Sequence, residues 1–373
     1  MRILFDSQIF DWQVNGGISR AIVEIANRLT TYPDTELLFK VKHSYNTYIQ
    51  NTPWLLKKPV LKNIHFKGKL RTVKLINEKI NRQYSDRLLK KGIPDIFHPT
   101  FYDPYFLKSL KKGTRLVITI HDLTNEKLDD RSAFRKKVLK WKNQIIERAD
   151  HITTVSNNTR KDLIEYYKVD PNKVTTVYHA GGFDPSFATK ESFREKVKDK
   201  YILFVGVRTA YKNFKGFIEE VAPLLKEFDI KIVAAGGGRM SADELSYMAA
   251  TGVSERVIAF PHISDPELYH LYRNAEVFVF PSLYEGFGVP PLEAMQCDCP
   301  SLLSNNSSLP EVGGEAALYF NPFVRGELQK QLRNLLLDEE LRKRLVNTGK
   351  EQIKRFTWDE TTRNYLKVYK ALL

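Results

Sequence analysis

The chain has 373 residues, of which 42% are hydrophobic and 27% are charged, a composition that indicates a folded, soluble protein and excludes a disordered or fibrous one. At roughly 100–200 residues per domain, this length predicts two domains. No apolar run approaches the ~18 residues of a membrane span, and the first residues lack the basic, apolar and small-residue order of a signal peptide. Two cysteines, Cys297 and Cys299, are too few for a disulfide framework or a zinc site and indicate a reducing, cytosolic compartment.

The positive charge is concentrated in the first half of the chain. Lysine and arginine outnumber aspartate and glutamate by 58 to 44 overall. Residues 1–180 hold 33 basic and 18 acidic side chains, whereas residues 181–373 hold 25 and 26. Such an asymmetry favours an anionic partner for the first half, namely a membrane surface, a phosphorylated acceptor or nucleic acid. The alternative is charge that serves solubility alone.

Strands and helices alternate along the first half. An apolar strand at residues 2–6 is followed by a glycine-bearing loop and by a helix at residues 18–29, where apolar residues recur at helical spacing. Further strands are predicted at residues 36–41, 95–98, 115–120, 151–155 and 174–178, and helices at residues 134–148 and 157–167. This alternation predicts a parallel, doubly wound sheet.

The same alternation restarts after a loop at residues 179–185. Asp265 is predicted to cap a helix that has Pro266 at its first position. The last stretch of the chain has a helical pattern. Strands are predicted at residues 201–205, 230–235, 256–260 and 277–280. We therefore predict two α/β domains, at residues 1–182 and 183–355, followed by a C-terminal helix within residues 356–373.

Motifs that directly follow strands are the candidates for a site, because open parallel sheets bind ligands beyond the carboxyl ends of their strands. Gly16 and Gly17 lie between the first strand and the first helix. Glycines there let the backbone approach an anion at the helix N-terminus. A tight turn into a helix is at least as good an explanation. The segment is not G-x-G-x-x-G, so the dinucleotide-binding fingerprint is absent.

Two cations follow the predicted strand at residues 201–205. Arg208 and Lys212 are four residues apart, between Gly206 and Asn213. An arginine holds two phosphate oxygens at once, and a lysine acts as a compact point charge. The pair therefore suits a diphosphate, and the alternative is two solvated surface cations.

The most informative stretch begins where the strand at residues 277–280 ends. Residues 281–294 read Pro-Ser-Leu-Tyr-Glu-Gly-Phe-Gly-Val-Pro-Pro-Leu-Glu-Ala. Glu285 lies in a loop, and Glu293 is expected on the first turn of the following helix. Carboxylates at these two places can hold pairs of hydroxyl groups, as on sugar rings, and the loop glycines leave backbone N–H groups for further oxygens.

This stretch resembles the signature of the retaining GT-B glycosyltransferases of family 4, the group 1 sugar transferases. Other family motifs are matched in the same order by residues 15–17, 119–123, 149–156 and 206–213. The resemblance covers essentially the whole chain, whereas residues 40–95 match no motif. It implies an α/β protein of two Rossmann-like, doubly wound domains facing each other across a cleft, with the C-terminal helix returning to the N-terminal domain.

The resemblance also implies roles for individual residues. Glu293 would hold the ribose hydroxyls of the donor nucleotide, and Glu285 the hydroxyls of the transferred sugar. Arg208 and Lys212 would neutralise the diphosphate, and His121 would lie at the sugar. The other donor-binding positions would be Gly16 and Gly17 in the N-terminal domain, and Gly206, Asn213, Phe260, His262, Ile263, Gly286, Phe287, Gly288 and Leu292 in the C-terminal domain.

The implied chemistry is transfer from a nucleoside-diphosphate sugar with no further cofactor. Fixed cations stabilise the negative charge that builds on the leaving oxygen. Glu285 and Glu293 would bind different ends of a donor, whereas the two carboxyls of a retaining glycosidase flank one bond. We therefore expect front-face transfer, in which the leaving phosphate takes the proton of the acceptor. No Asp-x-Asp cluster is present, so no metal ion is expected. GDP-mannose is weakly preferred as the donor, because some mannosyltransferases carry a similar Arg-x-x-x-Lys-Asn segment.

The basic charge of the first half is densest at residues 53–91. Twelve basic residues lie within residues 57–91 against two acidic ones, interleaved with aromatic and aliphatic residues. Residues 131–148 add seven basic side chains against Glu147. Such a pattern is typical of a segment that lies on anionic lipid. We therefore expect a glycan or lipid-linked acceptor in the N-terminal domain and peripheral binding to the inner face of the cell membrane. A solvated helix face and nucleic-acid contact are the alternatives.

Three features leave other interpretations open. Residues 179–182 read His-Ala-Gly-Gly where the family commonly has Pro-Asn-Gly, and residues 209–211 read Thr-Ala-Tyr inside the cation motif. Without the resemblance, His121 beside Asp122 would be interpreted as a structural histidine. The same fold also supports inverting transfer and epimerisation of a sugar nucleotide. A nucleic-acid-binding protein is disfavoured, because no recognition motif of that class is present.

Overall fold

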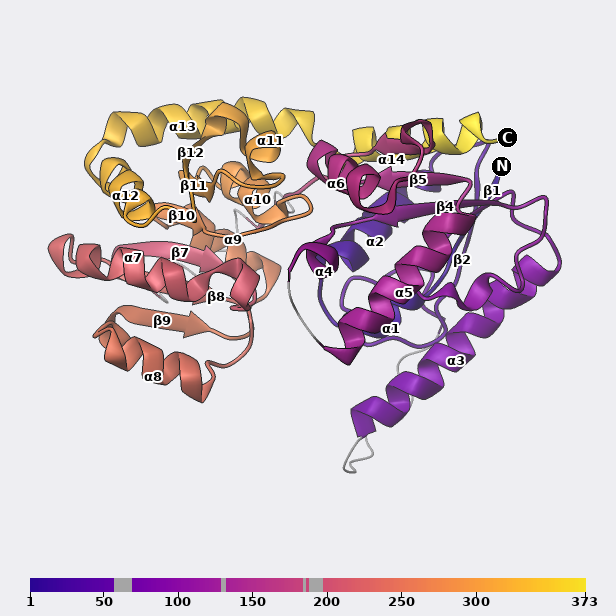
Figure 1. Ribbon diagram of the computed structural model, residues 1–373, viewed down its shortest axis with the longest axis horizontal. Helices are drawn as coiled ribbons and strands as arrows, with labels where there is room; N and C mark the ends of the chain where they lie inside the picture. Colours follow the sequence, from indigo (N-terminus) through magenta and orange to yellow (C-terminus); the bar gives the residue numbers. More distant parts are fainter. Residues whose placement is uncertain (57–68, 129–131, 184–185, 188–196) are drawn as a thin grey trace. The chain divides into compact units, whose positions relative to one another are not determined.

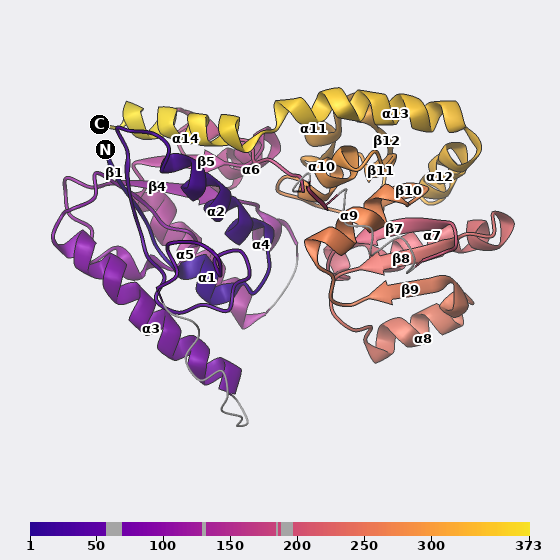
Figure 2. The ribbon, with the colours of Figure 1, turned by 180° about the vertical axis from the view of Figure 1, so that it is seen from behind.

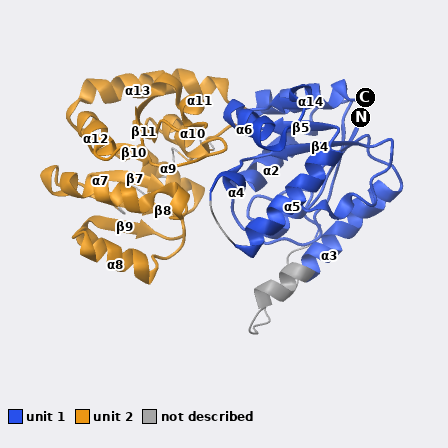
Figure 3. Ribbon diagram, viewed as in Figure 1, with its two compact units in different colours: residues 1–179, 358–373 blue, residues 180–357 orange. Residues whose placement is uncertain are grey.

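A computed structural model describes the chain except for residues 57–68, 129–131, 184–185 and 188–196 (Figure 1). The chain folds into two compact units. Unit 1 consists of residues 1–179 and 358–373, and unit 2 consists of residues 180–357 (Figure 3).

Unit 1 is built on a six-stranded parallel sheet with the order β2-β1-β3-β4-β5-β6. Its strands are β1 (Arg2–Phe5), β2 (Glu36–Phe39), β3 (Ile96–His98), β4 (Arg115–Ile120), β5 (His151–Thr154) and β6 (Val174–Thr176). Its α-helices are α1 (Gln8–Trp12), α2 (Gly17–Leu29), α3 (Lys69–Lys90), α4 (Thr124–Lys127), α5 (Ala133–Arg148), α6 (Asn157–Tyr167) and α14 (Trp358–Ala371). α14 lies beside α2 (Figures 1 and 2), which confirms that the C-terminal helix returns to the N-terminal domain.

Buried hydroxyl groups tie α14 to the sheet of unit 1. The hydroxyl of Tyr369 is 2.6 Å from Nδ1 of His98, at the end of β3. Nε2 of the same ring is 2.8 Å from Oγ1 of Thr119, which is 3.1 Å from the hydroxyl of Tyr365. Because buried polar groups need hydrogen-bond partners, this network makes α14 an integral part of unit 1.

Unit 2 repeats the architecture with the strand order β12-β11-β10-β7-β8-β9, again parallel. Its strands are β7 (Tyr201–Val205), β8 (Lys231–Ala235), β9 (Val257–Phe260), β10 (Val277–Phe280), β11 (Ser301–Ser304) and β12 (Ala317–Phe320). Its α-helices are α7 (Phe214–Glu227), α8 (Ala242–Ala250), α9 (Asp265–Arg273), α10 (Val289–Gln296), α11 (Leu309–Gly313), α12 (Glu327–Leu337) and α13 (Glu339–Gln352). Both units are therefore doubly wound α/β structures, as predicted.

Several elements were given no predicted range, among them the helices α3, α7, α8, α12 and α13, and three others lie where no element was expected. Residues 8–12 form α1 inside the predicted glycine-bearing loop, and β11 and β12 continue the sheet beyond β10. β11 reads Ser-Leu-Leu-Ser, a run too short to show a period. The predicted helix cap was wrong by one residue, because Ser264 precedes α9 and its N–H donates to the carboxylate of Glu267 at 2.7 Å. The other predicted elements are present, with ends that differ by at most two residues.

The segment that joins the two units is packed against α10. A Cβ on Gly181 would lie 2.6 Å from Cβ of Leu292, so a larger residue does not fit there. Gly182 has a φ of +120°, a conformation that favours glycine. Gln296 accepts a hydrogen bond from the N–H of Phe183 and donates one to its carbonyl oxygen. These residues therefore belong structurally to unit 2, although the sequence placed the domain boundary at residue 182.

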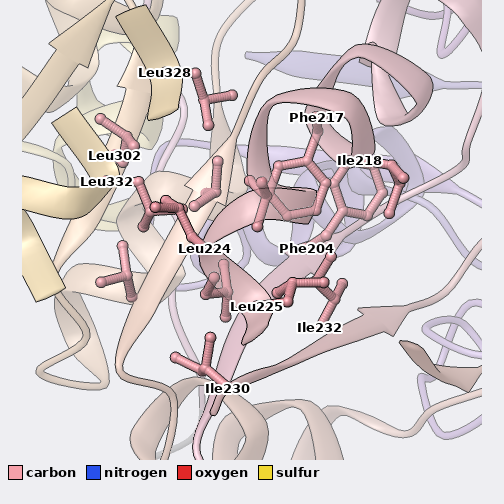
Figure 4. Packing of buried hydrophobic residues seen from close by; sticks show 14 of the residues in the cluster. Phe204, Phe217, Ile218, Leu224, Leu225, Ile230, Ile232, Leu302, Leu328 and Leu332 are labelled. Atoms are coloured by element: carbon pink, nitrogen blue, oxygen red, sulfur yellow. The ribbon is translucent and has the colours of Figure 1, made fainter. Parts of the chain in front are cut away.

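The main apolar core of unit 2 lies between the sheet and α7 (Figure 4). Phe204 of β7 contacts Phe214 and Phe217 of α7, with ring centroids 4.9 and 5.9 Å apart. Leu224 and Ile232 are buried in the same cluster. This core supports β7 and α7, between which the predicted cation motif lies.

Removing the Phe204 ring should destabilise unit 2 severely. Phe204→Ala is expected to lower the free energy of unfolding by about 3–5 kcal/mol, because it removes a buried ring and leaves a cavity. Urea unfolding followed by circular dichroism measures the change. Phe323→Ala is the control, since Phe323 is 71% exposed, and its unfolding curve should match the wild type. Equal curves for all three proteins would contradict the assignment of this core.

Candidate functional site

The carboxyl ends of β7 and β10 bring two of the predicted motifs together. The chain runs from β7 to one side of the sheet and from β10 to the other, and ligands of doubly wound folds bind at such a switch point. Nζ of Lys212 lies 2.5 Å from Oε1 of Glu285, and the two side chains are only 12% and 13% exposed. The N–H of Leu283 also donates to the carbonyl oxygen of Tyr211 at 2.7 Å. Residues 73 positions apart in the sequence thus form one polar centre.

Arg208 contacts the loop that follows β8. Its guanidinium pairs with Glu244 at 2.6 Å and is 3% exposed, and it donates to the carbonyl oxygens of Gly236 and Gly238 at 2.7 and 3.0 Å. Burial would raise the pKa of Glu244, but hydrogen bonds from Ser241 and Arg208 outweigh it and lower that pKa. In this arrangement Arg208 positions the loop, whereas the sequence analysis expected it to face a diphosphate.

Residues 306–308, which follow β11, support the Glu285 loop. Oγ of Ser307 accepts the N–H of Glu285 at 2.9 Å. Oγ of Ser308 reaches the carbonyl oxygens of Glu285 and Phe287 at 3.0 and 2.6 Å. Ser307 has a φ of +53°, a region that few residues other than glycine adopt. The sequence analysis missed this support because it missed β11. Ser307 and Ser308 directly follow a Ser-Asn-Asn run, and this polar run was the feature of the sequence from which the support could have been predicted.

Glu293 lies in α10, behind the same loop. It is the fifth residue of the helix rather than on the first turn, which corrects the predicted placement. The side chain is 6% exposed and accepts a hydrogen bond from the hydroxyl of Tyr272 at 3.3 Å. Burial, and secondarily the charge of Glu293, raise the pKa of Tyr272. α10 begins after Gly288, whose φ of +120° lets the loop turn sharply into the helix.

The remaining predicted positions of unit 2 fall into three groups. Phe260 and Ile263 line a cavity of about 240 Å³ between α9 and residues 197–201. Asn213 has a left-handed backbone conformation, with a φ of 55°, and caps α7. Leu292 is fully buried. Gly206, Gly286, Phe287 and Gly288 lie in the loops around the Lys212–Glu285 pair, and His262 follows β9. The cavity is thus separate from the ion pair, and Leu292 serves the packing of the core.

In unit 1, Gly16 directly precedes α2 and is enclosed by a neighbouring side chain. A Cβ at Gly16 would overlap the amide group of Gln13. The same amide oxygen accepts the N–H of Ser19 at 3.3 Å, and Oγ of Ser19 donates to the carbonyl oxygen of Gly16 at 3.0 Å. A Cβ at Gly17 would meet no atom within 4 Å. A larger residue at position 16 would therefore displace the Gln13 amide from its hydrogen bond with Ser19.

His121 follows β4 and is held by buried groups. Its N–H donates to the hydroxyl of Tyr102 at 3.0 Å, and its ring lies edge-on to His179, with centroids 5.5 Å apart. Lys142 and Glu126 form a fully buried ion pair at 3.0 Å below this loop. Burial, and then the nearby charges of His98 and Lys142, lower the pKa of His121 to about 3. The imidazole is therefore neutral at physiological pH.

Comparisons with known proteins identify the family. Residues 15–180 match the model of Glycosyltransferase Family 4, and residues 186–352 match that of Glycosyl transferases group 1. O-antigen chain mannosyltransferase B of Escherichia coli is 30% identical over 292 residues, covering 74% of each chain. The chain belongs to the group 1 glycosyltransferases. O-antigen chain mannosyltransferase RfbU of Salmonella typhimurium is 29% identical, over 58% of this glycosyltransferase and 60% of RfbU.

A solved structure shares the fold of the glycosyltransferase. Anabaena Alr3699/HepE in complex with UDP and glucose superimposes with a TM-score of 0.72 over the full length of both chains, at 15% identity. The two parallel six-stranded sheets described above are thus those of a GT-B protein, which confirms the predicted fold.

The basic segment of the glycosyltransferase is described only in part. Lysines 57, 58, 62 and 67 lie outside the described residues. In the described part of α3, Arg82 pairs with Asp103 at 2.6 Å and Lys90 pairs with Asp86 at 2.7 Å. Among the described residues, no helix is long and apolar enough to cross a bilayer.

The buried histidines of unit 1 should make its stability depend on pH. Burial lowers the pKa of His98 to about 3, whereas an unfolded histidine takes up a proton below about pH 6.5. The stability that comes from burying His98 in its neutral form is therefore complete above pH 6.5 and is lost as the pH falls towards 3. Asp11, whose pKa burial raises to about 7, acts in the opposite sense over much of this range.

Comparison with His98→Gln isolates the contribution of His98. Between about pH 7 and pH 5, the variant should lose about 2 kcal/mol less unfolding free energy than the wild type, because it has no imidazole to protonate on unfolding. Urea unfolding at both pH values measures the difference. Equal losses of unfolding free energy in the two proteins would show that His98 takes up its proton as readily in the folded state as in the unfolded state.

Proposed function

We propose that this glycosyltransferase moves a hexose, with retention of configuration, from a nucleoside-diphosphate sugar to a glycan or lipid-linked acceptor in surface polysaccharide synthesis. GDP-mannose is the weakly preferred donor. The observation that carries the proposal is the Lys212–Glu285 pair at the switch point of unit 2. The names of O-antigen chain mannosyltransferases B and RfbU support the class of donor sugar and product.

The ion pair is suited to receive both charged and neutral parts of a donor. A diphosphate offers Lys212 anionic oxygens in place of the Glu285 carboxylate, and the released carboxylate then accepts hydroxyl groups of the sugar. The lysine charge stabilises the leaving phosphate as the sugar bond breaks, in a site with little competing water. The ring of Phe280 lies 4.7 Å from Nζ of Lys212, which adds a cation–π contact and limits the positions of the ammonium group.

Retention follows in this proposal without a carboxylate nucleophile. Glu285 engages Lys212, and Glu293 contacts Tyr272 from within α10, so the two carboxylates serve different parts of the donor. As the bond between the sugar and the phosphate breaks, the acceptor oxygen bonds to the anomeric carbon on the same face. The leaving phosphate oxygen takes the proton of the acceptor hydroxyl. Neutral His121 would contribute a hydrogen bond to the sugar rather than a charge. Metal independence is part of the proposal, and activity should persist in a chelator.

The acceptor is assigned to unit 1 and, through the basic segment at residues 53–91, to an anionic membrane surface. At about 1 kcal/mol per cation near such a surface, a few exposed lysines give reversible binding. Co-sedimentation with vesicles that contain or lack anionic lipid tests this part separately. Equal sedimentation with both kinds of vesicle would favour a soluble acceptor.

A thermal-shift screen with UDP-, GDP- and dTDP-sugars tests the donor class. A ligand at 100 times its dissociation constant adds about 2.7 kcal/mol of stability, so the cognate donor should raise the melting temperature clearly. Glu293→Ala should reduce this shift, because the ribose hydroxyls of the donor would lose the carboxylate that binds them. Product NMR then reports the anomeric configuration. An inverted product would contradict front-face transfer, and product formed without any acceptor would indicate an epimerase.

Lys212→Gln should slow the chemical step. The expected fall in kcat is about 10²–10³-fold, the size seen when one group that stabilises developing charge is removed. Lys215→Gln is the matched control, because Lys215 lies in α7 with its ammonium 5.1 Å from the ring of Tyr247. Initial rates at saturating donor measure kcat. A normal kcat in Lys212→Gln, with the fold intact, would refute the leaving-group role.

A further inference from the structure

Unit 1 carries an aromatic cluster that the donor chemistry does not use. The indole ring of Trp12 lies 5.4 Å from the ring of Phe134 and 5.9 Å from that of Phe101, measured between centroids, at interplanar angles of 36° and 27°. The ring of Trp141 meets Trp12 edge-on at 6.1 Å. Trp12 thus contacts three aromatic rings: it is tilted against Phe134, stacked with Phe101 and edge-on to Trp141.

The cluster lies at the ligand-binding edge of the unit 1 sheet. Trp12 ends α1, which follows β1, and Phe101 lies in the loop after β3. β1 and β3 are neighbours at the point where the chain switches from one side of the sheet to the other. Phe134 begins α5, the next long helix after the His121 loop. The cluster thus stands among the segments that follow the first, third and fourth strands, where doubly wound sheets bind their ligands.

The cluster is open at one end and closed at the other. Phe134 is 47% exposed, whereas Trp141 is 8% exposed. Lys137 holds its ammonium 4.4 Å from the centroid of the Trp141 ring, which helps to fix that ring. An exposed aromatic ring held rigid by a buried one loses little entropy when it binds a flat, partly apolar partner.

We propose that Phe134, backed by Trp12, forms a stacking platform for a pyranose ring of the acceptor. The proposal rests on the glycosyl transfer proposed above and assigns the acceptor subsite within unit 1. A pyranose presents polarised C–H groups on one face, and the negative face of an aromatic ring attracts them. The hydroxyl groups on the ring edge remain free for hydrogen bonds and for transfer. The occupant is a sugar, because the ring stands at the ligand edge of the unit to which the proposed function assigns a glycan acceptor.

Three substitutions of Phe134 separate stacking from plain apolar contact. The acceptor probes are the water-soluble methyl α-glycosides of mannose, glucose and N-acetylglucosamine, used without lipid. Phe134→Ala and Phe134→Leu should each raise the acceptor KM about tenfold or more, because the flat ring is lost. Phe134→Tyr keeps the ring and should retain the wild-type acceptor KM. Tyr166→Ala is the control, since Tyr166 is 53% exposed in the same unit and should leave activity unchanged.

The outcomes distinguish the platform from its alternatives. If Phe134→Leu behaves like the wild type, the surface needs only apolar area and the platform is refuted. If the variants differ from the wild type only with lipid vesicles, the cluster is a membrane contact, which also refutes it. If no glycoside acts as an acceptor or is seen to bind by ligand-detected NMR, the platform fails even where nucleotide sugars stabilise the protein. Failure of the donor proposal is recognised separately, by the absence of any nucleotide-sugar shift.

Discussion

The low dielectric at the carboxyl ends of the two sheets requires each charge buried there to have a partner. Among the described residues, the ion pairs Lys212–Glu285, Arg208–Glu244 and Lys142–Glu126 meet this requirement. The pairs join residues 73, 36 and 16 positions apart in the sequence, each on a different segment from its partner. These ion pairs offset the cost of removing the charges from water. They also fix the positions of the loops that carry the candidate site.

The pairs of unit 2 differ in how readily they can exchange a partner. In the part of the chain that the structure describes, Lys212 pairs with the carboxylate of Glu285. A diphosphate would supply Lys212 with an equivalent anion, and hydroxyl groups of the sugar would donate to the released carboxylate. Arg208 divides its guanidinium between Glu244 and several carbonyl oxygens of the loop after β8. Replacing all of these with phosphate oxygens would break the ion pair with Glu244 and release the part-buried carbonyl groups of this loop. This difference explains why we assign the leaving-group charge to Lys212 and a positioning role to Arg208.

Unit 1 uses burial in a complementary way. His121 and His179 are held neutral, since burial lowers the pKa of each to about 3. Lys142 of α5 pairs with Glu126 and donates from Nζ to the carbonyl oxygen of Asp122 at 2.9 Å, so it holds the segment that follows β4. The edge of unit 1 therefore offers a neutral imidazole and an aromatic surface. Such an edge suits a neutral sugar, whereas unit 2 suits an anion.

The sequence by itself determined the parallel α/β class, most strand positions and the glutamate motif around Glu285, because periodicity and strand-end motifs are local properties. The pairing of Lys212 with Glu285, the loop-holding role of Arg208 and the support from Ser307 and Ser308 were decided only by the tertiary structure. Which groups meet at a sheet edge depends on strand order, and β11 had no local pattern to reveal it. A charge also acts according to the partners that burial leaves it, and those are known only once the chain is folded.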